Sequence, residues 1–147
     1  PMEQPIEDEI QNKGLTAPRV TPADIEGVIA TEYYFTGGDG FAGALSVSDK
    51  FSKLADAERI IAAPAPLELH TFCVIVLRNG FTVTGESACV SPENFDAEIG
   101  RKVARANAVN KIWPLLGYQL KSELAYDEQT SLVSTHGGFG APEGGYD

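Results

Sequence analysis

Two apolar runs separated by Asn79-Gly80 form the clearest pattern in the chain. Residues 72–77 are rich in β-branched and aromatic side chains, and a second run follows at 81–84. Asn-Gly between two such runs is typical of a two-residue type I′ turn, in which both central residues take positive φ. The pattern therefore predicts a β-hairpin with strands over 70–78 and 81–89.

The position of the turn decides which side chains share a face of this hairpin. With Asn79-Gly80 as the whole turn, Val76 lies opposite Val83 and Val74 opposite Gly85. Because side chains alternate along a strand, this register predicts one apolar face, which we expect to be the core. That face carries Phe72, Val74, Val76, Phe81, Val83 and Cys89. The opposite face is mixed and is expected to meet water or a partner. It carries Cys73, Ile75, Leu77, Thr82, Thr84 and Glu86.

A long amphipathic helix is predicted after the hairpin. Ser91 and Asn94 are alternative N-caps. Apolar residues then recur at spacings of three and four, which predicts a buried stripe of Phe95, Ile99, Val103, Ala106, Val109 and Trp113. Pro114 interrupts the pattern, and leucines resume it as far as Leu124. We therefore expect a helix over 92–125 with a kink at Trp113-Pro114.

The side of this helix opposite the stripe carries small residues four positions apart. They are Gly100, Ala104 and Ala108, flanked by Arg101, Arg105 and Lys111. Two interpretations stay open. Either this side is a solvated helix back that uses Ala for its helix propensity, or the helix lies between its own sheet and a neighbouring copy. The second interpretation predicts a homo-oligomer.

The N-terminal part adds a shorter helix. Thr21-Pro22 followed by Asp24 has the form of a helix start, and the pattern predicts a helix over 22–32. The predicted fold class is therefore α+β, with a small antiparallel sheet built on the 70–89 hairpin. This sheet is packed against the long kinked C-terminal helix and the short N-terminal helix. The expected domain spans 20–127, between a disordered acidic arm (2–19) and a disordered Gly-rich tail (128–147).

The net charge of −10 is concentrated outside the predicted core. Residues 1–50 hold nine acids and three bases, whereas 67–125 hold six of each and are neutral. This distribution argues against a protein that binds duplex nucleic acid, which needs a basic face. No run of eighteen apolar residues and no signal-like segment is found, so we expect a soluble, cytoplasmic protein with no membrane partner.

The residues of the usual catalytic sites are scarce. The chain has two histidines and no C-x-x-C motif, so neither a metal site nor a Cys-His nucleophile pair is expected. Cys73 and Cys89 are interpreted as buried thiols that do not form a disulfide. We therefore expect a protein that is not an enzyme and that uses no cofactor.

What remains is a set of residues suited to binding an anion. Arg78, Arg101, Arg105 and Lys111 are cationic, Asn94 lies near a helix N-terminus, and Phe81 could stack on a base. The aromatic residues at 33–35 are a second candidate for stacking. Each of these residues also has a plain structural interpretation, as core, cap or solvated charge.

Several of these residues also carry a family resemblance. The motifs are the run 71–88, the run 92–96, Gly100-Arg101-Lys102, Ala108 and Ile112-Trp113-Pro114. Thr21-Pro22 and Tyr34-Phe35-Thr36 add to them upstream. In these motifs the chain resembles a family of small tailed-phage accessory proteins. That family is similar to the first-described Thoeris anti-defence proteins of phages, which are non-catalytic sponges for nucleotide signals of bacterial immunity.

The resemblance implies a ligand and a pocket. The signals bound by such sponges include cyclic ADP-ribose isomers and the cyclic oligonucleotides of CBASS-type immunity. Their pocket combines an aromatic residue from the sheet, an Asn and a basic residue from the helix, and the matching positions here are Phe81, Asn94 and Lys111. Two functions remain open: a phage-encoded binder of a small nucleotide second messenger, or a phage accessory or structural module whose ligand is another protein.

Overall fold

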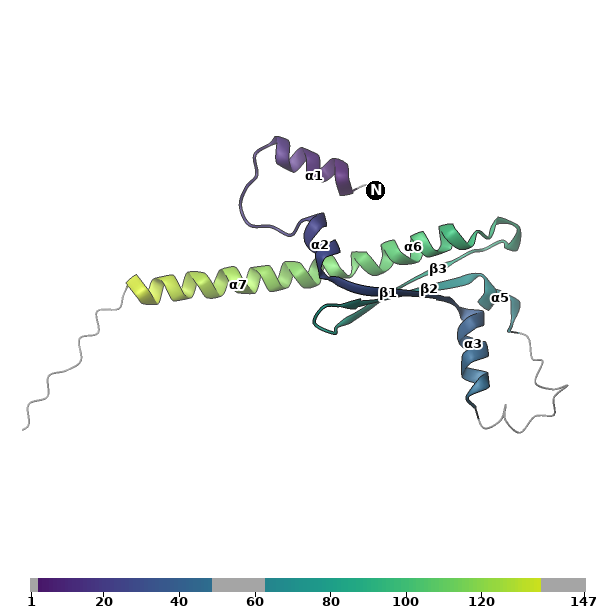
Figure 1. Ribbon diagram of the computed structural model, residues 1–147. Helices are drawn as coiled ribbons and strands as arrows, with labels where there is room; N and C mark the ends of the chain where they lie inside the picture. The colour runs from purple at the N-terminus through teal and green to yellow at the C-terminus, as the bar shows by residue number, and fades with distance from the viewer. Residues whose placement is uncertain (1–2, 49–62, 136–147) are drawn as a thin grey trace, which may run out of the picture.

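The computed structural model describes residues 3–48 and 63–135. Its centre is an antiparallel sheet in the order β1-β2-β3, formed by Ile29–Thr36, His70–Leu77 and Thr82–Ala88. Helix α6 (Ala97–Asn110) lies along one face of this sheet, and α7 (Ile112–Thr135) continues from it and extends past the sheet (Figure 1). The α+β fold predicted from the sequence is confirmed.

Strand β1 occupies residues that the sequence pattern assigned partly to a helix. Helix α2 (Pro22–Val28) starts as predicted, with Thr21 and Asp24 forming a capping box, but it ends well before residue 32. β-Branched and aromatic residues are dense in 29–36 and favour a strand. Seven residue pairs join β1 to β2 in antiparallel register, and Tyr33 lies opposite Val74. The chain adopts the strand because this pairing supplies a hydrogen-bonding partner that the local sequence could not reveal.

The hairpin turn has three residues instead of the predicted two. Leu77 N donates to Phe81 O at 2.8 Å, and Gly80 N donates to Leu77 O at 2.9 Å. Within the described residues only Gly80 and Gly14 have positive φ, so Asn79 does not take the conformation of a type I′ turn. A three-residue loop that ends on a left-handed glycine is the next most common hairpin connection. The predicted turn type was therefore wrong, although its place in the sequence was right.

This extra loop residue moves the register by one position and exchanges the two faces of β2. Ile75 lies opposite Val83 and Cys73 opposite Gly85. The core side of β2 carries Cys73, Ile75 and Leu77, which are at most 4% exposed. The predicted core face, with Phe72, Val74 and Val76, is the outer one. A shift of one residue has this effect because side chains alternate along a strand.

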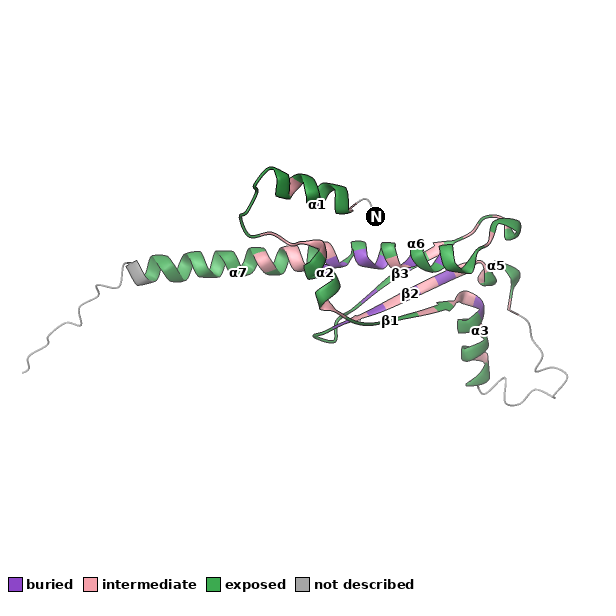
Figure 2. Ribbon diagram, turned by 45° about the horizontal axis from the view of Figure 1, so that its top comes forward, coloured by how far each residue is buried: buried purple, intermediate pink, exposed green. Residues whose placement is uncertain are grey.

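The small residues of α6 face its own sheet. Gly100, Ala104 and Ala108 are buried, whereas Ile99 and Val103 of the predicted core stripe are 60% and 43% exposed. Figure 2 shows the buried segments of α6 (purple) against β2 and β3. The interpretation of the small side as a solvated helix back was therefore wrong, and so was the prediction that Ile99 and Val103 lie in the core.

Gly85 explains why the small residues face inward. A Cβ atom on Gly85 would overlap the carbonyl oxygen of Ala104 and the amide nitrogen of Ala108. The helix backbone therefore lies directly on the strand, and only Gly and Ala fit in the contact. The close approach predicted from the small residues does occur, but the partner is the sheet of the same chain.

The long helix breaks three residues before Pro114. Helix α6 ends at Asn110, Lys111 is its C-cap, and α7 begins at Ile112. A proline ring clashes with the carbonyl group of the residue four positions earlier, which here is Asn110. Pro114 itself lies in the first turn of α7, where its missing N–H costs no hydrogen bond. The predicted kink is present, and the clash places it earlier than expected.

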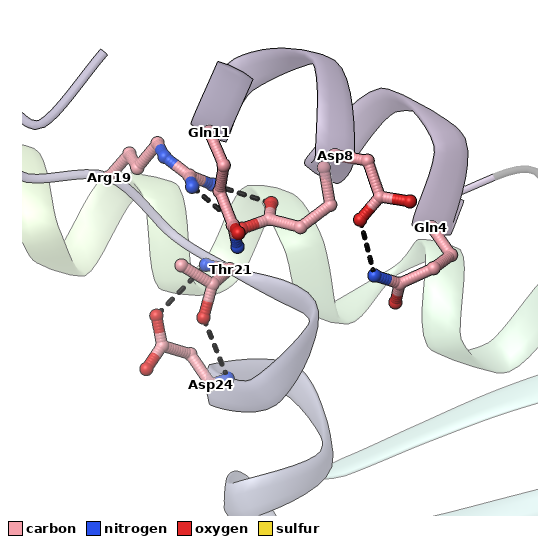
Figure 3. A network of polar contacts seen from close by, with 7 residues as sticks. Gln4, Asp8, Gln11, Arg19, Thr21 and Asp24 are labelled. Atoms are coloured by element: carbon pink, nitrogen blue, oxygen red, sulfur yellow. Dashed lines mark hydrogen bonds and ion pairs between the residues drawn. The ribbon is translucent and has the colours of Figure 1, made fainter. Parts of the chain in front are cut away.

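The acidic arm, for which disorder was predicted over 2–19, contains helix α1 (Glu3–Asn12). The Glu7 carboxylate accepts hydrogen bonds from Arg19 Nη1 and Nη2 at 2.7 and 2.6 Å, and from Gln11 Nε2 at 3.1 Å (Figure 3). Trp113 Nε1 donates to Glu3 Oε1 at 3.3 Å. These contacts hold α1 beside the domain, which compositional reasoning could not anticipate. Of the C-terminal tail predicted over 128–147, residues 128–135 belong to helix α7, and 136–147 lie outside the described residues.

The remaining elements are short. Helix α3 (Gly37–Ser46) follows β1, with Thr36 and Asp39 forming a second capping box. Helix α5 (Ala65–Glu68) precedes β2, and the 3-10 helix η1 (Pro92–Asn94) precedes α6. No helix in the described part of the chain is long and apolar enough to span a membrane.

Candidate ligand-binding site

The turn end of the hairpin presents an aromatic ring. Phe81 follows the three-residue loop, and its amide donates to Asn79 Oδ1 at 2.9 Å. Its backbone oxygen accepts from Leu77 N, so the loop is fixed on both sides of the residue. The Phe81 side chain was predicted to lie in the core, but it is 54% exposed. A ring held by a rigid loop and open to solvent is suited to stacking on a flat ligand.

Arg78 anchors the same turn to helix α2. Its backbone amide donates to Val28 O at 2.9 Å, and its Nε donates to Gly27 O at 2.6 Å. These two bonds satisfy carbonyl groups at the end of α2, where the helix leaves them without intrahelical partners. The guanidinium group is therefore held in place at the turn end of the sheet.

Lys111 lies at this end as well, because α6 runs antiparallel to β3. Gly100 packs on Thr71, which pairs with Ser87 near the end of β3, whereas Ala108 packs on Gly85. The C-terminal end of α6 therefore lies toward the hairpin turn. Lys111 is the C-cap of the helix at this end. The Lys111 side chain is exposed and forms no ion pair among the described residues. Arg78, Phe81 and Lys111 thus share one end of the sheet.

Asn94 lies at the opposite end, beside the last residues of β3. It belongs to η1 and lines a small hollow of roughly 160 Å³ that also includes Thr71, Ser87 and Gly100. Asp96 also lines this hollow; it is the N-cap of α6 and accepts a hydrogen bond from Ile99 N at 2.9 Å. The cap expected at Ser91 or Asn94 is thus made by Asp96. A single chain does not bring Asn94 together with Phe81 and Lys111.

The guanidinium group of Arg105 is hydrogen-bonded to two carboxylates of the same chain. Its Nε donates to Glu32 at 2.8 Å, and its Nη2 donates to Glu26 at 3.0 Å. The hydrogen bond to Glu26, followed by that to Glu32, raises the pKa of the Arg105 guanidinium. These bonds tie α6 to α2 and β1 across the sheet. An anionic ligand at Arg105 would have to compete with two carboxylates. This competition could not be predicted, because strand β1 was not predicted.

Arg101 precedes Arg105 by one helical turn. Its side chain is exposed and forms no ion pair within 3–48 and 63–135. The next residue, Lys102, pairs with Glu98 at 3.1 Å. The two arginines predicted to act together are therefore in different electrostatic settings, and only Arg101 is open to a ligand.

The aromatic residues at 33–35 divide between the two faces of β1. Tyr33 and Phe35 are exposed on the outer face, and Phe35 stacks on Phe72 with ring centroids 5.5 Å apart. Tyr34 points toward α6, and burial, with the nearby Cys73 and Glu32, raises its pKa to about 12. Burial also raises the pKa of the Cys73 thiol. Cys73 and Cys89 are both free, as predicted.

The described residues hold no group of three or more His, Cys, Asp or Glu side chains with the geometry of a metal site.

The chain matches the model of the phage protein (N4 Gp49/phage Sf6 gene 66) family over residues 20–124. No curated protein and no solved structure matches it. The matched range begins just before α2 and ends within α7, and it contains the sheet, α6 and every candidate ligand residue. The chain therefore belongs to the phage protein (N4 Gp49/phage Sf6 gene 66) family.

Proposed function

We infer that this phage protein binds and sequesters a cyclic nucleotide signal of bacterial immunity, without catalysis and as a homo-oligomer in the cytoplasm of the infected host. The observation that carries the proposal is the grouping of Phe81, Arg78 and Lys111 at the turn end of the sheet. A cyclic nucleotide offers a flat base and anionic phosphates, and these three side chains offer a ring and two cations. The ligands expected are cyclic ADP-ribose isomers and cyclic oligonucleotides.

Local charge supports an anionic ligand although the whole chain is acidic. The acids near this end that could repel a phosphate are occupied elsewhere, since Glu26 and Glu32 are bonded to Arg105. Lys111 has no such partner in the part of the chain that the structure describes. Lys111 is therefore open to a ligand at the same end of the sheet as the exposed ring of Phe81.

Calorimetric titration with a panel of cyclic dinucleotides, cyclic trinucleotides and cyclic ADP-ribose isomers tests the proposal. A charge-assisted hydrogen bond contributes about 1.5–3 kcal/mol, so Lys111→Ala should weaken binding about tenfold to a hundredfold. Lys111→Arg should bind at least as tightly as the wild type, because its planar fork can hold a phosphate with two bonds. Lys102→Ala removes the same charge from the N-terminal half of α6, where Lys102 pairs with Glu98, and is the control.

Sequestration also requires that the ligand come back unchanged. Heat denaturation of the complex should release the nucleotide with its original mass and chromatographic retention. A cleaved or altered product would show that the protein is an enzyme.

A second function is favoured by helix α7. Tyr118, Tyr126 and Leu132 are 79%, 70% and 56% exposed on a helix that extends past the sheet (Figure 1). Exposed apolar side chains on a projecting helix suit a module whose ligand is another protein. No heat signal with any nucleotide at millimolar concentration would favour this function over sequestration.

A further inference from the structure

Helix α1 and the family domain enclose a hollow that is separate from the proposed nucleotide site. It measures roughly 380 Å³ and is lined by residues of α1, of the segment that leads into α2, and of the start of α7. None of Arg78, Phe81 and Lys111 lines it. Its walls carry five apolar side chains, Ile6, Ile10, Val20, Pro22 and Trp113, and three charged ones, Glu3, Glu7 and Arg19.

Two polar contacts hold α1 over this hollow, and the apolar side chains of α1 do not fill the space. Glu7 is hydrogen-bonded to Arg19, and Trp113 Nε1 donates to Glu3 Oε1. Ile6 lines the hollow and is nevertheless 60% exposed. On the domain side, Val20 and Trp113 pack against the hydrophobic core. Because an apolar cavity holds water poorly, such a space is suited to the apolar part of a ligand.

The volume of the hollow restricts the ligand to a small molecule. Pockets that bury drug-sized ligands measure about 300–1,000 Å³, and this hollow is near the lower end of that range. It is suited to a single ring with a short side chain. A cyclic dinucleotide, with two bases and two phosphates, is too large for it.

The charge of the walls selects the sign of the ligand. Glu7 and Arg19 cancel each other, because Nη1 and Nη2 of Arg19 both donate to the Glu7 carboxylate. Glu3 is the third charged residue of the lining, and it forms no ion pair among the described residues. A cation in the hollow would therefore meet an uncompensated carboxylate, whereas an anion would be repelled by it.

We propose that this hollow binds a small organic cation, with its apolar body against Ile10 and Val20 and its ammonium group at Glu3. The indole of Trp113 donates to Oε1 of Glu3, so the second carboxylate oxygen is left to accept from the ammonium group. The ring of Trp113 adds to the attraction, because the face of an indole attracts cations. This ligand has the opposite charge to a nucleotide and occupies a different place on the chain.

Three probes with the same ring and different charges test the proposal. They are 2-phenylethylammonium, neutral 2-phenylethanol and anionic 3-phenylpropionate. Trp113 is the one tryptophan in the chain, so its fluorescence reports binding in the hollow. The ammonium probe should change the emission with a dissociation constant between about 10 µM and 1 mM, as expected for so small a ligand. The alcohol should bind about tenfold more weakly, because it makes no charge-assisted bond, and the carboxylate should not bind.

Glu3→Gln separates the effect of charge from that of packing. The amide oxygen of Gln can still accept from Trp113, so α1 should stay in place. The ammonium probe should then bind no more tightly than the alcohol. Glu9→Gln removes the same charge from the same helix at a residue that does not line the hollow, and it should bind the ammonium probe like the wild type.

Ile10→Phe tests the position of the ligand by filling the hollow. The larger side chain takes the space that the ring of the probe needs, so measurable binding of both the ammonium and the alcohol probe should be lost. Ile99→Phe makes the same change at a residue of α6 that is 60% exposed and should bind both probes like the wild type. Circular dichroism of each variant checks that the domain is folded.

Each other outcome overturns the proposal. An emission that does not change with the ammonium probe at millimolar concentration would mean that the hollow takes no such ligand. Equal binding of the ammonium and alcohol probes to the wild type would mean that Glu3 does not select a cation. Unchanged binding in Ile10→Phe would place the probe at another part of the chain.

Discussion

The two faces of the sheet differ in how they are packed, although the central strand is apolar on both. On the face covered by α6, Cys73 and Ile75 are fully buried, and Gly85 lets the helix backbone lie on the strand. The opposite face of the sheet, here called the uncovered face, carries Phe72 and Val74. These two side chains are only partly buried, and no helix of the described residues lies over them. The comparison shows that the small size of the residues in contact, Gly85 of β3 and Ala104 and Ala108 of α6, decides which face of the sheet is covered. The helix packs where Gly and Ala allow contact with its backbone.

The strongest test of this difference is to replace Gly85 by a residue with a side chain. In Gly85→Val the new atoms would overlap the backbone of α6, and backbone cannot move aside as the end of a side chain can. We expect a loss of more than about 3 kcal/mol of unfolding free energy, or no cooperative transition at all. Gly117→Ala is the control, since a Cβ there meets nothing within 4 Å. A stable, cooperative Gly85→Val protein would mean that α6 does not lie on β3 in this way.

Substitutions at two neighbouring residues of β2, one on each face, compare directly how much each face contributes to the unfolding free energy. Ile75→Ala should lower the unfolding free energy by about 2–5 kcal/mol, since Ile75 is fully buried beneath α6. Val74→Ala, measured in urea at a protein concentration where the chain is monomeric, should cost less than about 1.5 kcal/mol. Equal losses at the two positions would show that the uncovered face is packed as tightly as the covered one within a single chain.

Arg105 fixes the edge of the covered face by joining α6 to β1 and α2. Arg105→Gln should lower the unfolding free energy by about 1 kcal/mol, a modest value because the side chain remains 31% exposed and is partly screened. Arg101→Gln, which breaks no ion pair among the described residues, should leave the melting temperature unchanged. Thermal melting at low and high salt checks both values, and salt should reduce the Arg105 effect.

The smallest effect is expected for α1, outside the family domain. The hydrogen bonds from Arg19 lower the pKa of the Glu7 carboxyl below its ordinary value of 4.5. A lowered folded-state pKa means that this contact contributes fully above pH 4.5 and is lost as the pH falls through the folded-state value.

Fluorescence of Trp113, the one tryptophan in the chain, can follow this titration, because its indole donates to Glu3 of α1. Its emission should shift below pH 4.5 while the circular dichroism of the sheet stays constant. In Glu7→Gln the shift should be present at neutral pH and should not depend on acid. An emission that is the same in both proteins at every pH would mean that α1 is not held by Glu7.

The sequence by itself determined the elements whose signals are local. Asn79 and Gly80 marked the hairpin turn, Thr21 and Asp24 marked the start of α2, and Pro114 marked a break in the long helix. These signals work because turn, cap and proline sterics act over a few neighbouring residues. The antiparallel α+β arrangement followed from them.

The sequence also supplied most of the candidate site but could not assemble it. It selected Phe81, Arg78 and Lys111 for their chemistry, and the direction of α6 relative to β3 brings these residues to one end. It selected Arg105 for the same reason without revealing Glu26 and Glu32 as its partners. Those partners lie more than seventy positions away in the chain, and only the pairing of β1 with β2 brings them to α6.

The tertiary structure alone decided which faces are inside. One extra residue in the loop exchanged the two faces of β2, and no local pattern distinguishes a two-residue from a three-residue turn at Asn79-Gly80. The side of α6 that faces the sheet was likewise decided by fit. Ile99 and Val103 are the more hydrophobic residues, but the side of α6 that lies on the sheet carries Ala104 and Ala108 against Gly85 and Gly100 against Thr71. Periodicity measures hydrophobicity along one segment, whereas packing depends on the shape of two segments together.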